Sequence, residues 1–287
     1  MFKPSLAASN DAPEPFVPTN NGSKRRFGKK IFAVAAALTV VVVVVAFLFS
    51  NFSVATVPLS LNYEVGEQMV YDSSWTTFVD NDNQVIDAPD YSINGNSTVT
   101  IDVLSLDDDT YTISNTFNLD VLGVDRTANL TQQLTKSDYV NNFLIGDAAR
   151  LLYNMTGDHY DYYKLNILQA KIGDTLQIPV NTGNESIGTT GTLNIKFASI
   201  EEITVPAGTF KVFRLDYNAE VTAHANLPSL ISIPEPIPSQ ITGQTYLEYG
   251  TCRLIKSTVT ETSQISGPQS RNSTYTSERV LTQLTKP

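Results

Sequence analysis

Hydrophobic and polar residues follow two different patterns along this chain. Residues 31–49 form one continuous apolar run, IFAVAAALTVVVVVVAFLF, without a charged side chain. After residue 60, apolar residues instead recur at every second position, in short segments separated by Gly, Pro, Asn and Asp. A continuous run of this length is typical of a membrane-spanning helix, whereas period-two alternation is typical of strands with one buried face. The pattern therefore predicts a membrane anchor followed by a β-rich domain.

The apolar run has the dimensions of a single transmembrane helix. It would span about 28 Å, close to the hydrocarbon thickness of a bilayer. Five basic residues lie between positions 24 and 30 and none follows before Arg126, so the positive-inside rule places the N-terminus in the cytoplasm. A cleaved signal peptide is the alternative, because Ser53 and Ala55 suit a cleavage site; the long polar leader favours an uncleaved anchor. We predict a single-pass cell-membrane protein with an extracytoplasmic C-terminal domain.

This topology divides the chain into four parts. Residues 1–30 are predicted to be a disordered cytoplasmic tail that ends in the basic juxtamembrane cluster, because they are rich in Pro, Ala, Asn and Ser and lack apolar periodicity. The transmembrane helix is predicted at 31–49, a linker at 50–60, and an extracytoplasmic β-rich domain at 61–287.

Two hairpins stand out in the predicted domain. Apolar alternation before and after the acidic triplet 107–109 predicts one antiparallel hairpin. Pro206 and Gly208, between two alternating segments, predict a second. Residues 61–79 are predicted to be one long strand or two broken strands, and the remaining segments bring the expectation to nine to twelve strands.

Two segments depart from the strand pattern. Residues 141–155 carry apolar side chains at helical spacing and predict the one helix of the domain. Residues 226–244 contain four prolines, which predict an extended crossing loop rather than a central strand. The predicted fold class is mainly β, an antiparallel sheet with one helical element, preceded by a single transmembrane helix.

Charge and cysteine content restrict the function classes. The chain has 19 basic and 29 acidic residues, a net charge of −10. Residues 1–50 hold six of the basic and two of the acidic residues, so the rest carries a charge of −14. This acidic domain lacks the electrostatic footprint of a nucleic-acid binder. Cys252 is the only cysteine, so core packing must provide stability; we expect it buried in a strand, with an intermolecular bridge as the alternative.

Three segments resemble a known group of envelope proteins. They are YEVGEQMVY (63–71), ITVPAGTFKVFRL (203–215) and YLEYGTCRLIK (246–256). In this order they are similar to DUF3108-like domains and to the wider group with the lipoprotein-carrier LolA/LolB fold. The resemblance implies a curved antiparallel sheet, an open half-barrel wrapped around a helical element. Together with the anchor and the acidic surface, it also suggests an archaeal cell-surface protein.

The resemblance implies a concave apolar face able to hold a lipid. We therefore expect a non-catalytic ectodomain that binds an apolar ligand or lipid. The alternative is a structural or adhesive glycosylated ectodomain acting through contacts with other cell-surface proteins. The predicted lining residues of the ligand site are Phe197, Phe210, Phe213, Tyr217, Leu227, Leu230 and Ile233.

Candidate catalytic and metal-binding residues are sparse. The two histidines, His159 and His224, and the absence of a Gly-x-Ser-x-Gly motif argue against a Ser-His-Asp hydrolase. The tyrosines and aspartates around His159 are compatible with binding a sugar or a cation, but a Tyr-rich strand surface is the favoured interpretation. The acidic segment 80–91 lacks the Gly and Glu of a calcium loop. We predict no enzyme activity, no metal and no cofactor.

Six N-x-Ser/Thr sequons follow the apolar run, and outside a membrane such sequons accept N-glycans. Asn51 is the least suited, because it lies next to the predicted bilayer. The glycosylation candidates are Asn96, Asn129, Asn154, Asn184 and Asn272.

Overall fold

The structure is a computed structural model that describes residues 56–80, 89–121, 124–136, 169–183, 187–225, 236–265 and 271–287. The stretch Val54–Pro287 forms one compact unit. Within the described ranges, no helix combines the length and hydropathy that crossing a bilayer requires. The predicted tail, the anchor at 31–49 and the helix at 141–155 lie outside these ranges.

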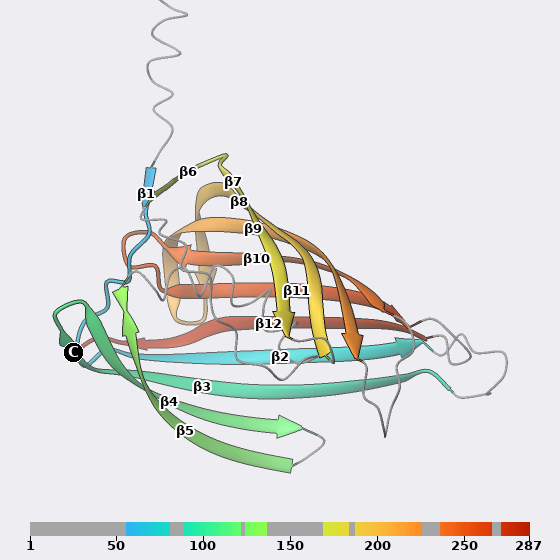
Figure 1. The fold of residues 1–287 in the computed structure, drawn as a ribbon. Coiled ribbons are helices and arrows are strands. Elements are labelled where there is room, and N and C mark those ends of the chain that lie inside the picture. Colours follow the sequence, from blue (N-terminus) through green and yellow to red (C-terminus); the bar gives the residue numbers. More distant parts are fainter. Residues whose placement is uncertain are drawn as a thin grey trace, which may run out of the picture. The chain divides into compact units, whose positions relative to one another are not determined.

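Twelve strands make up the described part of the chain (Figure 1). They are β1 (Thr56–Pro58), β2 (Gln68–Asp80), β3 (Tyr91–Asp107), β4 (Thr110–Val121), β5 (Val124–Thr135), β6 (Gln169–Lys171), β7 (Thr175–Gly183), β8 (Ile187–Val205), β9 (Gly208–Ala225), β10 (Ile237–Glu248), β11 (Leu254–Ile265) and β12 (Arg271–Thr285).

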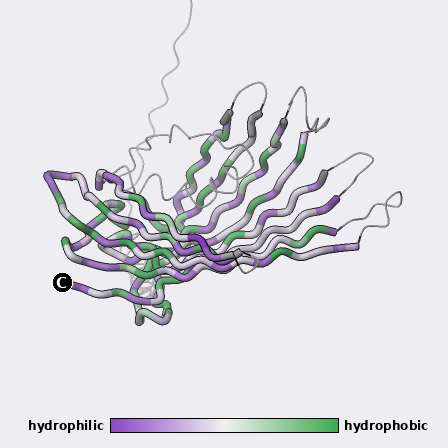
Figure 2. Tube along the Cα trace, turned by 90° about the horizontal axis from the view of Figure 1, so that it is seen from below, coloured by the Kyte–Doolittle hydropathy of each residue, from purple (hydrophilic) through white to green (hydrophobic). Residues whose placement is uncertain are grey.

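Ten of these strands form one antiparallel sheet in the order β5-β4-β3-β2-β12-β11-β10-β9-β8-β7, and β1 pairs with β6 separately. Each half of the large sheet is a simple meander, and the pairing of β12 with β2 joins the halves. The sheet is strongly twisted and curved (Figures 1 and 2). The mainly β, antiparallel, open-sheet prediction is therefore confirmed.

Both predicted hairpins are present. β3 and β4 turn at Asp108 and Asp109, and Asp108 adopts a left-handed φ of 50°, which Asp tolerates better than most residues. β8 and β9 turn at Pro206 and Ala207, and the Ala207 N–H donates a 3.4 Å hydrogen bond to the carbonyl oxygen of Leu281 on β12. The tip of this hairpin thus reaches a strand that is not its neighbour in the sheet.

Two expectations about strand boundaries were wrong. Residues 61–67 are not a strand, since β2 begins at Gln68. The prolyl segment does not exclude a central strand, because β10 begins at Ile237 within it. Pro238 pairs with Thr222 of β9, whereas the pairing with β11 begins only at Ser239. A proline at the start of a strand disrupts little of the hydrogen-bonding ladder.

Side chains alternate between two faces of the sheet, and Figure 2 shows the corresponding alternation of hydropathy along the strands. We call the face that carries the core the inner face and the opposite one the outer face. In the large sheet, every strand except the edge strand β5 contributes buried residues to the inner face among the described side chains. Examples are Tyr71, Val99, Ile113, Ile178, Ile195, Leu215, Ile241, Val259 and Leu281.

Two aromatic rings on the inner face lie over glycines of neighbouring strands. Trp75 pairs with Gly95, and Tyr217 pairs with Gly243, in the same row across the sheet. A Cβ at Gly95 would lie 2.4 Å from ring atoms of Trp75. The Tyr217 hydroxyl also donates a 3.2 Å hydrogen bond to the carbonyl oxygen of Thr258. These glycines therefore make room for rings that cover the backbone.

We expect Gly95→Ala to lower the free energy of unfolding by about 1–3 kcal/mol, because the Trp75 ring must move. Urea denaturation of both proteins measures the loss. In a Trp75→Leu background the same substitution should cost less. An unchanged midpoint for Gly95→Ala alone would contradict this account.

Candidate functional site

The predicted ligand-lining residues of β8 and β9 belong to the filled core. Phe197, Phe213 and Tyr217 are 2%, 0% and 4% exposed, and they pack within the buried cluster of the inner face. Phe210 is partly buried against the same cluster. Leu227, Leu230 and Ile233 lie outside the described residues, so the lining of an apolar pocket stays a prediction.

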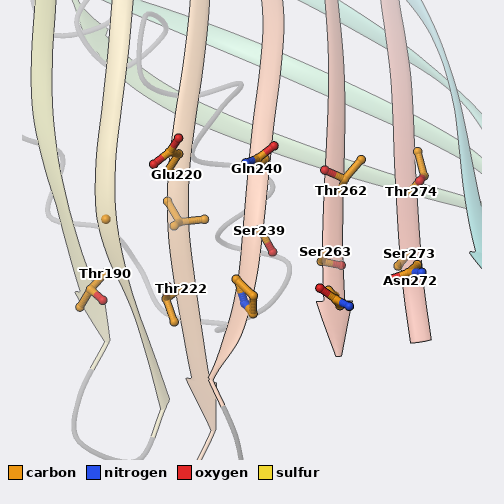
Figure 3. A pocket seen from close by; sticks show the side chains of 14 residues that line it. Thr190, Glu220, Thr222, Ser239, Gln240, Thr262, Ser263, Asn272, Ser273 and Thr274 are labelled. Atoms are coloured by element: carbon orange, nitrogen blue, oxygen red, sulfur yellow. The ribbon is translucent and has the colours of Figure 1, made fainter. Parts of the chain in front are cut away.

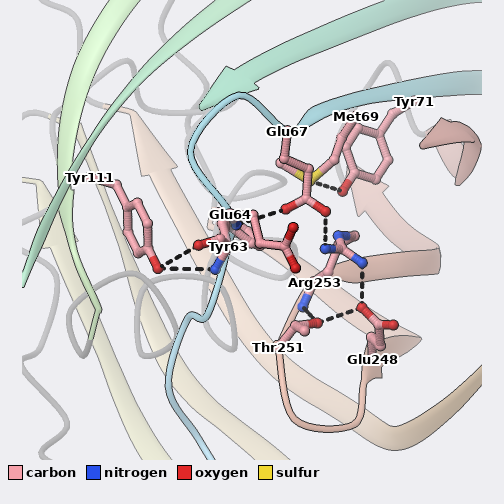
Figure 4. A network of polar contacts seen from close by, with 9 residues as sticks. All are labelled: Tyr63, Glu64, Glu67, Met69, Tyr71, Tyr111, Glu248, Thr251 and Arg253. Atoms are coloured by element: carbon pink, nitrogen blue, oxygen red, sulfur yellow. Dashed lines mark hydrogen bonds and ion pairs between the residues drawn. The ribbon is translucent and has the colours of Figure 1, made fainter. Parts of the chain in front are cut away.

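A buried ion pair connects two of the three sequence segments that carry the resemblance (Figure 4). Arg253, just before β11, pairs through Nη2 with Glu67, just before β2, and through Nη1 with Glu248 at the end of β10. Arg253 and Glu67 side chains are 2% and 0% exposed. The third segment contributes the β8–β9 hairpin rather than a member of this ion-pair network.

The turn between β10 and β11 is shaped to present Arg253. Cys252 has a left-handed φ of 53° and its N–H donates a 3.0 Å hydrogen bond to the Glu248 carbonyl oxygen. The Thr251 hydroxyl donates to the Glu248 carboxylate, and it accepts a hydrogen bond from the Arg253 backbone N–H. Cys252 is buried, as expected, but in this turn rather than in a strand, and burial raises the pKa of its thiol to about 11.

Electrostatics favours the charged form of Arg253. Burial lowers the pKa of its guanidinium, but the carboxylates of Glu248 and Glu67 outweigh burial and the net shift is upward. The guanidinium also lies 5.9 Å from the ring centroid of Tyr63. Tyr63 in turn donates its N–H to the Tyr111 hydroxyl at 3.0 Å and accepts a 3.1 Å hydrogen bond from it. This network holds the segment before β2 against the inner face.

We expect Arg253→Met and Glu67→Gln each to lower the free energy of unfolding by about 3–5 kcal/mol, because each leaves a buried polar or charged partner uncompensated. The double variant should lose clearly less than the sum of the two single losses. Chemical denaturation of the four proteins measures this coupling. Strictly additive losses would show that the pair does not act as a unit.

A second buried carboxyl, that of Glu261, lies on the inner face. Glu261 of β11 is 8% exposed and pairs across the sheet with Ile241 on one side and Tyr275 on the other. Burial raises the pKa of its carboxyl, and the hydroxyl of Ser239 lowers it only in part. The folded protein therefore retains the proton of Glu261 to a higher pH than the unfolded chain does.

This shift predicts a pH-dependent stability with a definite sign. The contribution of Glu261 is complete below the pKa of the unfolded chain, about 4.3, and is lost as the pH rises through the folded pKa. Glu261→Gln removes this loss, so the difference in unfolding free energy, variant minus wild type, should grow with pH by at most about 1.4 kcal/mol per unit. Urea denaturation between pH 4 and 8 measures it. A difference independent of pH would refute the assignment.

The outer face carries an open groove with a volume of about 720 Å³ across strands β8 to β12 (Figure 3). Two rows of outer-face side chains form its walls, and between them runs a row whose side chains belong to the inner face. Its walls and floor are formed by Thr190, Gly191, Glu220, Val221, Thr222, Pro238, Ser239, Gln240, Thr262, Ser263, Gln264, Asn272, Ser273 and Thr274. A smaller groove of about 380 Å³ crosses β3, β4 and β5. Of the residues predicted to hold an apolar ligand, the four that the structure describes, Phe197, Phe210, Phe213 and Tyr217, line neither groove.

The described sequon asparagines share one face of the sheet. Strand pairing places Asn96 of β3, Asn129 of β5 and Asn272 of β12 on the outer face, and all three are exposed. Asn272 lines the larger groove and Asn96 lines the smaller one. Asn154 and Asn184 lie outside the described residues.

Most of the residues considered for catalysis or metal binding lie outside the described ranges. His224 lies on β9, whereas His159 is outside the described ranges. No group of three His, Cys, Asp or Glu side chains that could hold a metal ion occurs in the part of the chain that the structure describes. Asp108 and Asp109 form the expected hairpin tip.

Comparisons with known proteins do not place the chain in a family. No family model and no curated protein matches it. Among solved structures it is similar to a Bacteroides fragilis protein described as exported, with a YmcC-like fold, at 12% identity and a TM-score of 0.33, covering 80% of this chain and 100% of that one. It is also similar to a protein described as a lipoprotein from Parabacteroides distasonis, at 11% identity and a TM-score of 0.31, covering 80% and 99%. A Salmonella typhi OmpF structure follows at 7% identity and a TM-score of 0.29, covering 77% and 99%. Such TM-scores do not establish a shared fold.

Proposed function

We propose that this chain is a single-pass, membrane-anchored cell-surface protein whose ectodomain is a glycosylated structural or adhesive module without catalytic activity. The observation that carries the proposal is the difference between the two faces of the sheet. The inner face is a packed core, whereas the outer face presents exposed sequons at Asn96, Asn129 and Asn272. An outer face of this kind is suited to contacts with other surface components.

Composition supports the same function. A single cysteine leaves stability to the core, and the inner face provides that core. The acidic charge and N-glycans would keep a surface domain soluble and hydrated. The uncleaved anchor, the extracytoplasmic location and the archaeal origin that the resemblance suggests are parts of this proposal.

A second candidate function, the binding of an apolar ligand or lipid, is favoured by one observation. The inner face continues from the core onto the edge hairpin of β4 and β5, where Leu119 and Leu130 are 40% and 51% exposed. Their strand neighbour Phe117 is only partly buried. An acyl chain lying along this edge would extend the core.

Native mass spectrometry of the protein from a host that attaches N-glycans and contains lipid distinguishes the two candidates. The structural or adhesive function predicts glycan mass at outer-face sequons and no mass that organic extraction removes. The lipid-binding function predicts a mass that organic extraction removes and that a Leu119→Ser/Leu130→Ser variant lacks, with its glycans unchanged. This result would overturn the structural or adhesive function. A protein free of glycans would overturn the glycosylated-surface proposal.

A further inference from the structure

The larger outer-face groove contains a sequon asparagine in its wall, and its chemistry matches that of a neutral saccharide. Asn272 lies at the β12 end of the groove and Thr190 at the β8 end (Figure 3). At about 4.8 Å per strand, the four strand spacings between them amount to about 19 Å. The groove is therefore long enough for several sugar residues arranged in a row across the strands.

Its side chains are hydroxyls and amides with little charge. Among the fourteen residues that line it, four are threonines, and Gln240 and Gln264 add amides to that of Asn272. Hydroxyl groups can donate and accept and can rotate to suit a partner, as sugar hydroxyls require. Among the described residues that line the groove, Glu220 is the one charged residue, and none is a Lys or Arg. This composition favours a neutral polar ligand over a phosphate or another anion.

The backbone N–H and C=O groups beneath the groove already pair with neighbouring strands of the sheet. Strands β9, β10, β11 and β12 are each paired on both sides, so a peptide could not add to them as a further strand. Recognition must use side chains. Exposed Phe78 pairs with Thr274 at the β12 end, and Pro238 lies in the groove wall, so both offer apolar surface for the face of a sugar ring.

A glycan attached to Asn272 would start inside this groove. Covalent attachment gives it a high effective concentration there, so weak contacts are enough to hold it. We propose that the outer-face groove of β8 to β12 cradles the first sugars of an N-glycan carried by Asn272, and that these contacts stabilise the folded ectodomain. The proposal rests on the glycosylation that the proposed function includes.

The test is a thermodynamic cycle on the full chain made in a glycosylating host, with site occupancy read from glycopeptides. Asn272→Gln and Asn272→Ser remove the glycan. Gln240→Ala/Thr262→Ala removes two groove side chains. Both changes should lower the Tm, and once the Asn272 glycan is absent the groove variant should lose most of its effect.

Two matched controls keep the result specific. Thr242→Ala/Thr260→Ala alters the same two strands on the outer face but outside the groove, and should leave the contribution of the Asn272 glycan intact. Asn129→Gln removes a glycan on β5, a strand that does not line the larger groove, and its effect should be independent of Gln240 and Thr262.

The remaining outcomes separate this inference from the proposed function. An occupied Asn272 whose glycan shows no coupling to the groove overturns the cradle and leaves the glycosylated ectodomain standing. The same holds when Asn272 is unoccupied but Asn96 or Asn129 carries a glycan. A chain without any glycan overturns both.

Discussion

The buried contact between Glu67 and Arg253 is the constraint on which the arrangement of the two half-sheets depends. Glu67 lies just before β2 and Arg253 just before β11, and β12 lies between these strands in the sheet. The ion pair therefore links the starts of β2 and β11, the two strands that lie on either side of β12. Because both side chains are removed from water, any arrangement that separates them leaves a buried charge unpaired, which is costly. The pair thus selects one relative position of the two meanders.

The two faces of the sheet divide stability and recognition between them. Aromatic and aliphatic side chains fill the inner face, and glycines at 95 and 243 allow rings to lie flat against the backbone. The outer face carries polar side chains, for example the hydrogen-bonded amides of Gln177, Asn194 and Asn218 on three strands and the ion pair of Lys256 with Glu278. Such a face has little apolar surface to bury, so contacts made there are polar and hydrated.

Alternation along the chain was enough to predict the class of the fold, the two hairpins and the range of strand numbers. It failed for Pro238, because a proline excludes a strand only where its missing N–H is needed by a neighbour. It did not reveal the partnership of Glu67 and Arg253, since their separation of 186 residues leaves no local signal; a glutamate and an arginine within apolar segments were the available hint. Likewise, the sequons were visible individually, but only strand register shows that Asn96, Asn129 and Asn272 share a face.

The central position of β12 has a consequence for how the chain folds. This strand comprises residues 271–285, yet its partner β2 comprises residues 68–80, so the sheet is dominated at its middle by a very non-local pairing. High contact order slows folding. During synthesis, β2 can pair with β3, but the backbone N–H and C=O groups on its other edge have no partner until β12 has been made. Until then, the first meander therefore exposes an unpaired strand edge, and such edges favour aggregation.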